Sequence, residues 1–110
     1  MSAAHLGLQG GRWFSLTLIE QMANIGSEVA RALEWKRKGN APYKEQALTR
    51  ALELFDLTLD DSRWKGRLRE IARAREVTCD YFYGGNQYSS THEFLDRYFL
   101  QFAQAARKNK

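Results

Sequence analysis

The sequence is poor in the residues that build disulfides, metal sites and tight turns. Its 110 residues include one cysteine, one proline and two histidines. The single Cys79 excludes an internal disulfide and suits a reducing, cytoplasmic location. His5 and His92 lack the repeated Glu-x-x-His pattern of a di-iron bundle, so we expect no metal site and no cofactor. No run of about 18 apolar residues occurs, and we expect no membrane span.

The first eleven residues lack the features of a targeting segment. They contain no basic region and no long apolar core of the kind found in a secretory signal. Glycine stands at positions 7, 10 and 11, so we interpret residues 1–11 as a flexible arm. Residues 12–110 are predicted to form one domain, because a chain of this length supports a single modest core.

The rest of the sequence is helix-forming, with short interruptions. Gly39-Asn40, Asp60-Asp61-Ser62 and Gly84-Gly85-Asn86 divide it into four predicted helices. These run from Trp13 to Gly39, from Asn40 to about Leu59, from about Arg63 to Tyr83, and from a capping box at Ser90 and Glu93 onward. Short connections make consecutive helices antiparallel neighbours. The predicted fold is therefore all-α, an up-down-up-down antiparallel four-helix bundle.

The first predicted helix is apolar around an unusually wide arc. At 100° per residue its apolar side chains span roughly 200°, whereas an amphipathic surface helix needs little more than about 100°. Either several neighbouring helices cover this arc, or a second subunit does. The side chains concerned are Leu16, Leu18, Ile19, Met22, Ala23, Ile25, Gly26, Val29, Ala30, Ala32 and Leu33.

Five aromatic residues are candidates for a contact between subunits. Three tyrosines follow one another closely near the end of the third predicted helix, where they cannot all share one buried stripe. Such clusters are enriched at subunit contacts, and stacking on nucleic-acid bases is the alternative. The candidates are Trp13, Trp35, Tyr81, Tyr83 and Tyr88.

Arg75 falls in the middle of the predicted apolar stripe of the third helix, between Ile71 and Cys79. A buried guanidinium needs a carboxylate partner. We therefore predict a buried ion pair, with a ligand-binding arginine as the alternative and Cys79 as a buried, inert thiol. Glu28 and Asp96 are candidate partners, because antiparallel packing would place them at about the same height along the bundle axis as Arg75. Asp56 is a third candidate, which the long arginine side chain could reach.

Basic residues gather at what the predicted topology makes one end of the molecule. The chain carries 17 Lys and Arg against 13 Asp and Glu, a net charge of +4 that permits nucleic-acid binding without requiring it. Basic side chains at the start of the third helix oppose its dipole. An anionic partner would explain them, and so would pairing with Asp60 and Asp61. The eight residues of this basic pole are Arg12, Arg63, Lys65, Arg67, Arg69, Arg107, Lys108 and Lys110.

Several short strings over about residues 12–108 resemble a known family. They are Asn24-Ile25-Gly26-Ser27-Glu28, Trp35-Lys36, Gly39-Asn40, Ala51-Leu52-Glu53-Leu54-Phe55-Asp56-Leu57-Thr58, Arg75-Glu76 and Tyr88-Ser89-Ser90-Thr91. The chain is similar to bacterial four-helix proteins encoded in intervening sequences of 23S ribosomal RNA genes. It also resembles the accessory variability protein of diversity-generating retroelements. The resemblance implies a four-helix bundle that assembles into a ring of five subunits and has no enzymatic activity. It also implies a role in binding nucleic acid or a nucleic-acid enzyme.

Two classes of function follow from these observations. The first is a non-enzymatic, oligomeric module that binds RNA, DNA or a nucleic-acid enzyme through the basic pole, because basic patches bind phosphate backbones without any sequence motif. The second is a structural or regulatory scaffold whose partner is another protein. No nucleophile and base can be paired from the sequence, so we expect neither an enzyme nor a small-molecule substrate.

Overall fold

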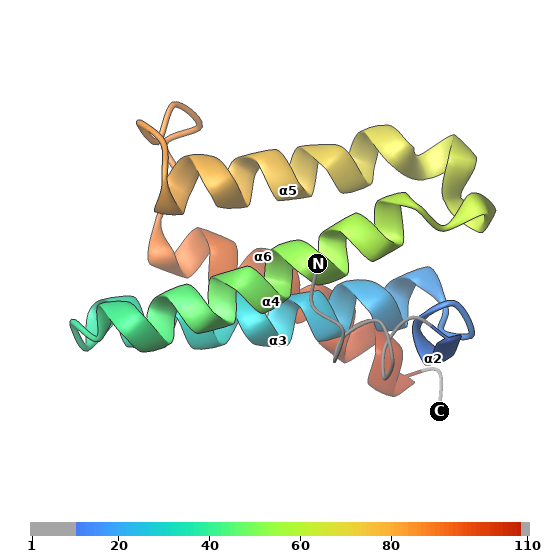
Figure 1. The fold of residues 1–110 in the computed structure, drawn as a ribbon, viewed down its shortest axis with the longest axis horizontal. Helices are drawn as coiled ribbons and strands as arrows, with labels where there is room; N and C mark the ends of the chain where they lie inside the picture. The colour runs from blue at the N-terminus through green and yellow to red at the C-terminus, as the bar shows by residue number, and fades with distance from the viewer. Residues whose placement is uncertain (1–10, 109–110) are drawn as a thin grey trace.

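The protein is described by a computed structural model that covers residues 11–108 (Figure 1). Its regular structure over these residues is entirely helical, which confirms the all-α prediction. None of the described helices is long and apolar enough to cross a membrane. The elements are α2 (Gly11–Trp13), α3 (Leu18–Arg37), α4 (Ala41–Leu59), the 3-10 helix η2 (Ser62–Arg67), α5 (Leu68–Phe82) and α6 (His92–Lys108).

Helix α3 lies at the centre of the arrangement. It packs closely against α4 and against α6, whereas α5 contacts mainly α4 and η2. Figure 1 shows α5 as the outermost helix, with α6 running behind α3 and α4. The backbones of α5 and α6 approach each other less closely than those of α3 and its two neighbours. This difference in packing leaves space between α5 and α6.

The α3–α6 contact depends on Gly26. A Cβ atom at this position would lie 2.7 Å from the Cβ of Phe99, closer than two carbon atoms can pack. Phe99 in turn meets Phe55 of α4 edge to face, with 6.3 Å between ring centroids. The absence of a side chain at Gly26 therefore lets α6 sit against α3 and places Phe99 in the core.

The wide apolar arc of α3 is covered within one chain. Met22, Ile25, Val29, Ala32 and Leu33 are at most 4% exposed, and Gly26 is buried with them. The outer members of the arc, among them Ile19 and Ala30, are half-buried. Of the two explanations for this arc, coverage by neighbouring helices is the one observed. The arc therefore does not require a second subunit.

The first predicted helix begins later than expected. Trp13 belongs to the short α2, and α3 starts at Leu18 because Thr17 and Glu20 form a capping box. Thr17 Oγ1 accepts from the Glu20 amide at 3.1 Å, and Glu20 Oε1 accepts from the Thr17 amide at 2.9 Å. The other end was predicted correctly, since Gly39 has a φ of +78° just past the helix and Asn40 caps α4.

The predicted capping box at Ser90 and Glu93 is wrong. Helix α6 begins at His92, and Thr91 Oγ1 accepts from the Phe94 amide at 3.0 Å. The Asn86 side chain instead binds both backbone groups of Ser90, accepting from its amide at 2.8 Å and donating to its carbonyl at 2.9 Å. These two bonds fix Ser90 in the loop, one residue before the cap.

The third predicted helix also differs from expectation. It opens as η2, which Asp61 caps, and becomes α-helical only at Leu68. Its buried stripe is Ile71, Ala74 and Thr78, so the predicted stripe through Arg75 is out of phase by one position. Ala74 offers a small apolar surface, and the Thr78 hydroxyl is satisfied by donating to the Ala74 carbonyl at 2.9 Å. Arg75 therefore lies at the edge of the helix interface.

Candidate functional site

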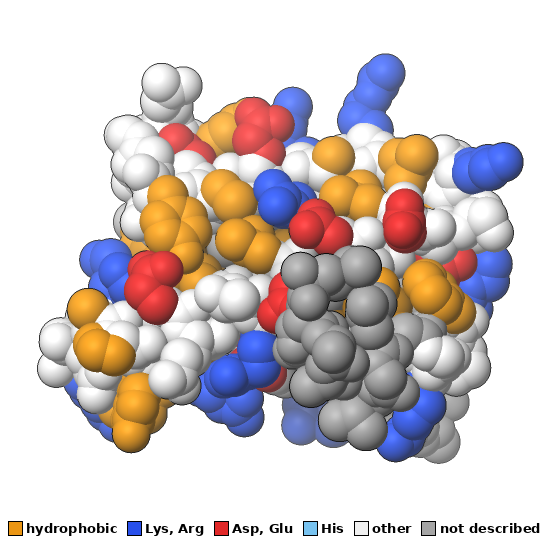
Figure 2. Space-filling view, viewed as in Figure 1, with side chains coloured by type: hydrophobic (Ala, Val, Ile, Leu, Met, Phe, Trp, Pro, Cys, Tyr) orange, Lys and Arg blue, Asp and Glu red, His pale blue; other side chains and the backbone are white. Residues whose placement is uncertain are grey.

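The basic pole is assembled from three separate parts of the chain. Arg12 lies on α2, four of its members lie on η2 and the start of α5, and Arg107 and Lys108 end α6. Figure 1 shows these three parts at the same end of the molecule, and Figure 2 shows Lys and Arg side chains along that end. Lys110 lies outside the described residues. The predicted juxtaposition of these segments is therefore present for the described members.

A buried polar network holds this end together. The Trp13 indole donates to Thr58 Oγ1 at 2.9 Å, and both side chains are at most 1% exposed. The Gln21 amide donates to the Trp13 carbonyl at 2.8 Å and to Asp61 at 3.1 Å. Gln21 also accepts from the Trp64 indole at 2.9 Å. One fully buried glutamine thus connects α2, α3 and η2, and we call these five residues the corner network.

Arg63 closes the corner network and is unavailable to a partner. Its guanidinium binds both oxygens of Asp61, at 3.0 Å and 2.6 Å, and donates to the Leu16 carbonyl at 2.7 Å. The same guanidinium lies 4.4 Å from the centre of the Trp64 ring. Hydrogen bonds from Arg63, with a further one from Gln21, lower the pKa of Asp61 to about 2 against the desolvation that would raise it.

The basic pole is smaller than the sequence predicted. Arg63 forms an ion pair with Asp61, and Arg67 forms a close ion pair with Glu70, one turn further along the chain. The explanation by pairing is therefore correct for Arg63, although Asp60 takes no part in it. The structure records no carboxylate partner among residues 11–108 for the remaining members, which are Arg12, Lys65, Arg69, Arg107 and Lys108. We call these five residues the reduced pole.

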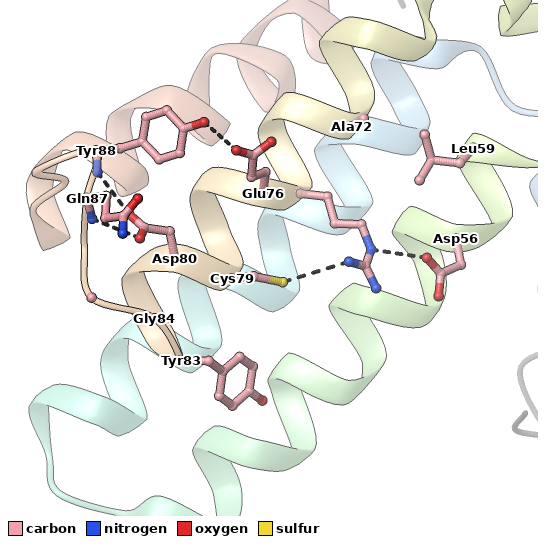
Figure 3. Close-up of a pocket in the computed structure, with 12 residues that line it drawn as sticks. Asp56, Leu59, Ala72, Glu76, Cys79, Asp80, Tyr83, Gly84, Gln87 and Tyr88 are labelled. Carbon is pink, nitrogen blue, oxygen red and sulfur yellow. Dashed lines mark hydrogen bonds and ion pairs between the residues drawn. The ribbon is translucent and has the colours of Figure 1, made fainter.

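A groove of about 760 Å³ lies over the outer face of α4 and α5 (Figure 3). Arg75 crosses it and binds Asp56 at 3.1 Å. The predicted burial of this pair is wrong, since the side chains of Arg75 and Asp56 are 35% and 62% exposed. Asp56 is nevertheless one of the three partners that the sequence suggested. Arg75 also donates to Cys79 Sγ at 3.9 Å, and partial burial raises the pKa of this thiol.

The far end of the groove is the loop that follows α5. Asp80 accepts from the amides of Gln87 and Tyr88 at 2.8 Å and 3.0 Å, which folds the loop back onto the helix (Figure 3). The Tyr88 hydroxyl donates to Glu76, and this bond raises the pKa of Tyr88. Each carboxylate on the groove wall is thus bound to another group of the same chain. Among the described residues, the groove contains no unpaired acid beside a nucleophile.

The five predicted contact aromatics fall into three groups. Trp13 is enclosed within its own chain and is removed from the candidates. Trp35 is half-buried and packs edge to face on Tyr43, with 4.8 Å between centroids, and Tyr81 is half-buried against Phe82. Tyr83 and Tyr88 are 52% and 41% exposed. The two exposed tyrosines remain available to a partner.

Tyr83 is nevertheless bound on its own surface. Its hydroxyl donates to Glu45 of α4 at 2.8 Å. Desolvation, with a smaller effect of the Glu45 bond, raises the pKa of Tyr83 to about 12. The phenol is therefore neutral at physiological pH and serves as a hydrogen-bond donor that joins α5 to α4.

A second cavity, between α5 and α6, was missed in the sequence. It has a volume of about 270 Å³, and its walls include Val77, Phe94 and Tyr98. Phe94 and Tyr98 belong to the broad apolar face of α6, and yet Phe94 is 53% exposed. The unusual breadth of that apolar face was the available signal, since α6 offers more apolar surface than α3 alone can cover.

Residues 11–108 contain no group of three or more His, Cys, Asp and Glu side chains that could hold a metal ion. His5 lies outside the described residues, and His92 is 3.7 Å from Glu34. Comparison of the chain with protein-family models, with curated proteins and with solved structures gives no match.

Proposed function

We propose that this chain is an antiparallel four-helix bundle that binds the phosphate backbone of RNA or DNA through the reduced pole. The observation that carries the proposal is the meeting of three separate segments that bring unpaired basic side chains to one end. Arg69 also stands in the first turn of α5, where its charge opposes the helix dipole. A charge retained against the dipole and without a carboxylate partner is explained by an anionic ligand.

The corner network supports this role because it fixes the geometry of the pole. Trp13, Gln21 and Asp61 tie the segments that carry Arg12 and Lys65 to one another. Ordered cations lose less conformational entropy on binding than cations on a floppy arm. The reduced pole contains no module that reads base edges, so binding depends on the phosphates and is nearly indifferent to sequence.

The family resemblance extends the proposal to the assembly of several copies of the chain into a ring. A ring of five chains would present several copies of the reduced pole, and avidity would raise the affinity above that of one copy. Multi-angle light scattering at micromolar concentration tests this part. A species with the mass of one chain, 12.8 kDa, contradicts assembly without affecting the phosphate-binding part.

The test of binding is a gel shift with mixed single-stranded and double-stranded RNA and DNA at several salt concentrations. We expect affinity to fall steeply with salt, because each phosphate contact releases a counterion. A variant with Lys65, Arg69, Arg107 and Lys108 changed to Gln should lose most of the binding. A protein that shifts no nucleic acid even at low salt contradicts the proposal and leaves the protein scaffold as the function.

A matched control separates the pole from net charge. Changing Lys36, Lys38, Lys44 and Arg97 to Gln removes the same four charges elsewhere, so that both variants have a formal net charge of zero, from +4 less 4. The control variant should retain most of the affinity. Equal loss in both variants would show that binding follows overall charge and not the pole.

A further inference from the structure

The cavity between α5 and α6 has the character of a ligand site, and it is separate from the reduced pole. Aromatic and aliphatic side chains form most of its wall, among them Val77, Phe94 and Tyr98. Phe94 and Tyr98 lie nearly parallel, with ring centroids 6.4 Å apart and planes 19° apart. Its volume of about 270 Å³ is close to the lower end of the range for small-molecule sites, so it suits a molecule of one or two rings.

Two polar groups on the cavity wall lack partners. Ser90 is 5% exposed, and its hydroxyl has no hydrogen-bond partner among the described residues. Both backbone groups of Ser90 are already bound by Asn86, which leaves the hydroxyl as the only unused polar group of that residue. A buried hydroxyl without a partner costs free energy. The bound ligand would supply the missing bond after a change of the Ser90 rotamer.

The second polar group is Arg73. Its guanidinium lies 5.4 Å from the centre of the Tyr88 ring, and the structure records no carboxylate bound to it over residues 11–108. An arginine fork matches a carboxylate with two parallel hydrogen bonds. Arg73 is exposed, and the structure records no hydrogen bond from its guanidinium to residues 11–108, so its donors can reach a ligand. The cavity therefore combines an apolar body, a cationic side and one buried hydroxyl.

We propose that this cavity binds a small aromatic carboxylate. The ring would lie among Val77, Phe94 and Tyr98, the carboxylate would pair with Arg73, and the Ser90 hydroxyl would bind a polar atom of the ring or its substituent. None of these residues belongs to the reduced pole. The proposal for this site can therefore be tested independently of the proposal for nucleic-acid binding.

The test uses 1-naphthoate as the probe and its uncharged analogue 1-naphthamide as the comparison, with binding followed by calorimetry and by saturation-transfer NMR. We expect wild-type protein to bind naphthoate, and Arg73→Gln to weaken that binding about tenfold, since a charged hydrogen bond is lost. Naphthamide should bind wild type and Arg73→Gln equally. Arg97→Gln, a change of the same kind on α6 outside the cavity wall, should leave naphthoate binding unchanged.

Two kinds of result would overturn the proposal. One is the absence of naphthoate binding at millimolar concentration, or equal binding by wild type and Arg73→Gln. The other is an oligomeric wild type that Phe94→Ser converts into folded monomers, because the cavity would then be covered by a second copy of the chain. Light scattering and circular dichroism on the same samples distinguish this second result from simple unfolding.

Discussion

The corner network and the α5–α6 cavity contain the same kinds of side chain in opposite states. At the corner, Arg63 stacks on Trp64 and binds Asp61, and the Thr58 hydroxyl accepts from a tryptophan. At the cavity, Arg73 stacks on Tyr88 without a carboxylate, and the Ser90 hydroxyl has no partner among the described residues. An arginine, an aromatic ring and a hydroxyl occur in both places.

The difference between them lies in whether the polar groups are satisfied within the chain. A satisfied network rigidifies the fold and has no capacity left for a ligand. Unsatisfied groups beside an apolar space do little for stability and retain their capacity for binding. The corner therefore stabilises the protein, and the cavity is where we expect a ligand. Substitutions at the two places should differ accordingly.

The largest difference in the free energy of unfolding is expected between substitutions at two aromatic residues. Trp13→Ala should lower the free energy of unfolding by about 3–5 kcal/mol, because it empties a fully buried site and removes the donor to Thr58. Phe94→Ala, at a side chain 53% exposed, should cost less than about 1 kcal/mol. Urea unfolding followed by circular dichroism measures both. Equal losses would contradict the comparison.

The acid stability of the corner should depend on Asp61. Its pKa is lowered from 3.8 to about 2 in the folded protein, so its contribution is complete above pH 3.8 and is lost as the pH falls towards 2. A pKa change of this size corresponds to a contribution of about 2 kcal/mol. Thermal unfolding from pH 5 to pH 2 measures the slope. Asp61→Asn should unfold with a shallower pH dependence, and an unchanged slope would assign the acid sensitivity to other carboxylates.

The two hydroxyls offer a smaller and more direct comparison. Thr58→Val keeps the shape of the side chain but leaves the Trp13 indole without an acceptor, which should cost about 1–2 kcal/mol. Ser90→Ala removes a hydroxyl that already lacks a partner, so stability should stay within about 0.5 kcal/mol or rise. Chemical unfolding at neutral pH is the measurement. A large loss in Ser90→Ala would indicate that its hydroxyl is satisfied by water.

A small effect is also expected at the exposed ion pair on the outer face. Arg75→Ala should cost less than about 1 kcal/mol, because Arg75 and Asp56 are both partly open to solvent, 35% and 62% exposed. A double-mutant cycle with Asp56→Ala isolates the pair. A coupling above about 2 kcal/mol would mean that this pair behaves as a buried one, as the sequence had suggested.

Local signals predicted much of the fold. The helix stops at Gly39-Asn40 and at Gly84-Gly85-Asn86 are correct because glycine and asparagine act on their own backbone, independently of tertiary context. The capping box of Thr17 and Glu20 is an equally local signal. The apolar pattern that continues across it from Trp13 masks this signal in the sequence. Competing local signals thus explain the error at the start of α3.

Neither the buried face of α5 nor the corner network could be predicted from the sequence. Apolar spacing around Arg75 fits two stripes one residue apart, and only the packed structure shows that the buried one passes through Ala74. Gln21 borders the apolar arc of α3, where a lone polar residue gives no sign of its partners. Its bonds reach Trp13, Asp61 and Trp64, and the last two lie 40 and 43 positions away. The partners of a buried amide depend on the fold as a whole.

The distribution of tryptophan gives the molecule a built-in optical reporter. Of its three tryptophans, Trp13 is buried in the corner network and Trp64 donates its indole proton to Gln21. Trp35 packs on Tyr43 near the opposite end of α3. The walls of the α5–α6 cavity contain tyrosine and phenylalanine but no tryptophan among the described residues. Two of the three indoles therefore lie at the corner and none on the cavity wall, so a change in indole emission excited at long wavelength reports the opening of the corner once Trp35 is replaced by Phe.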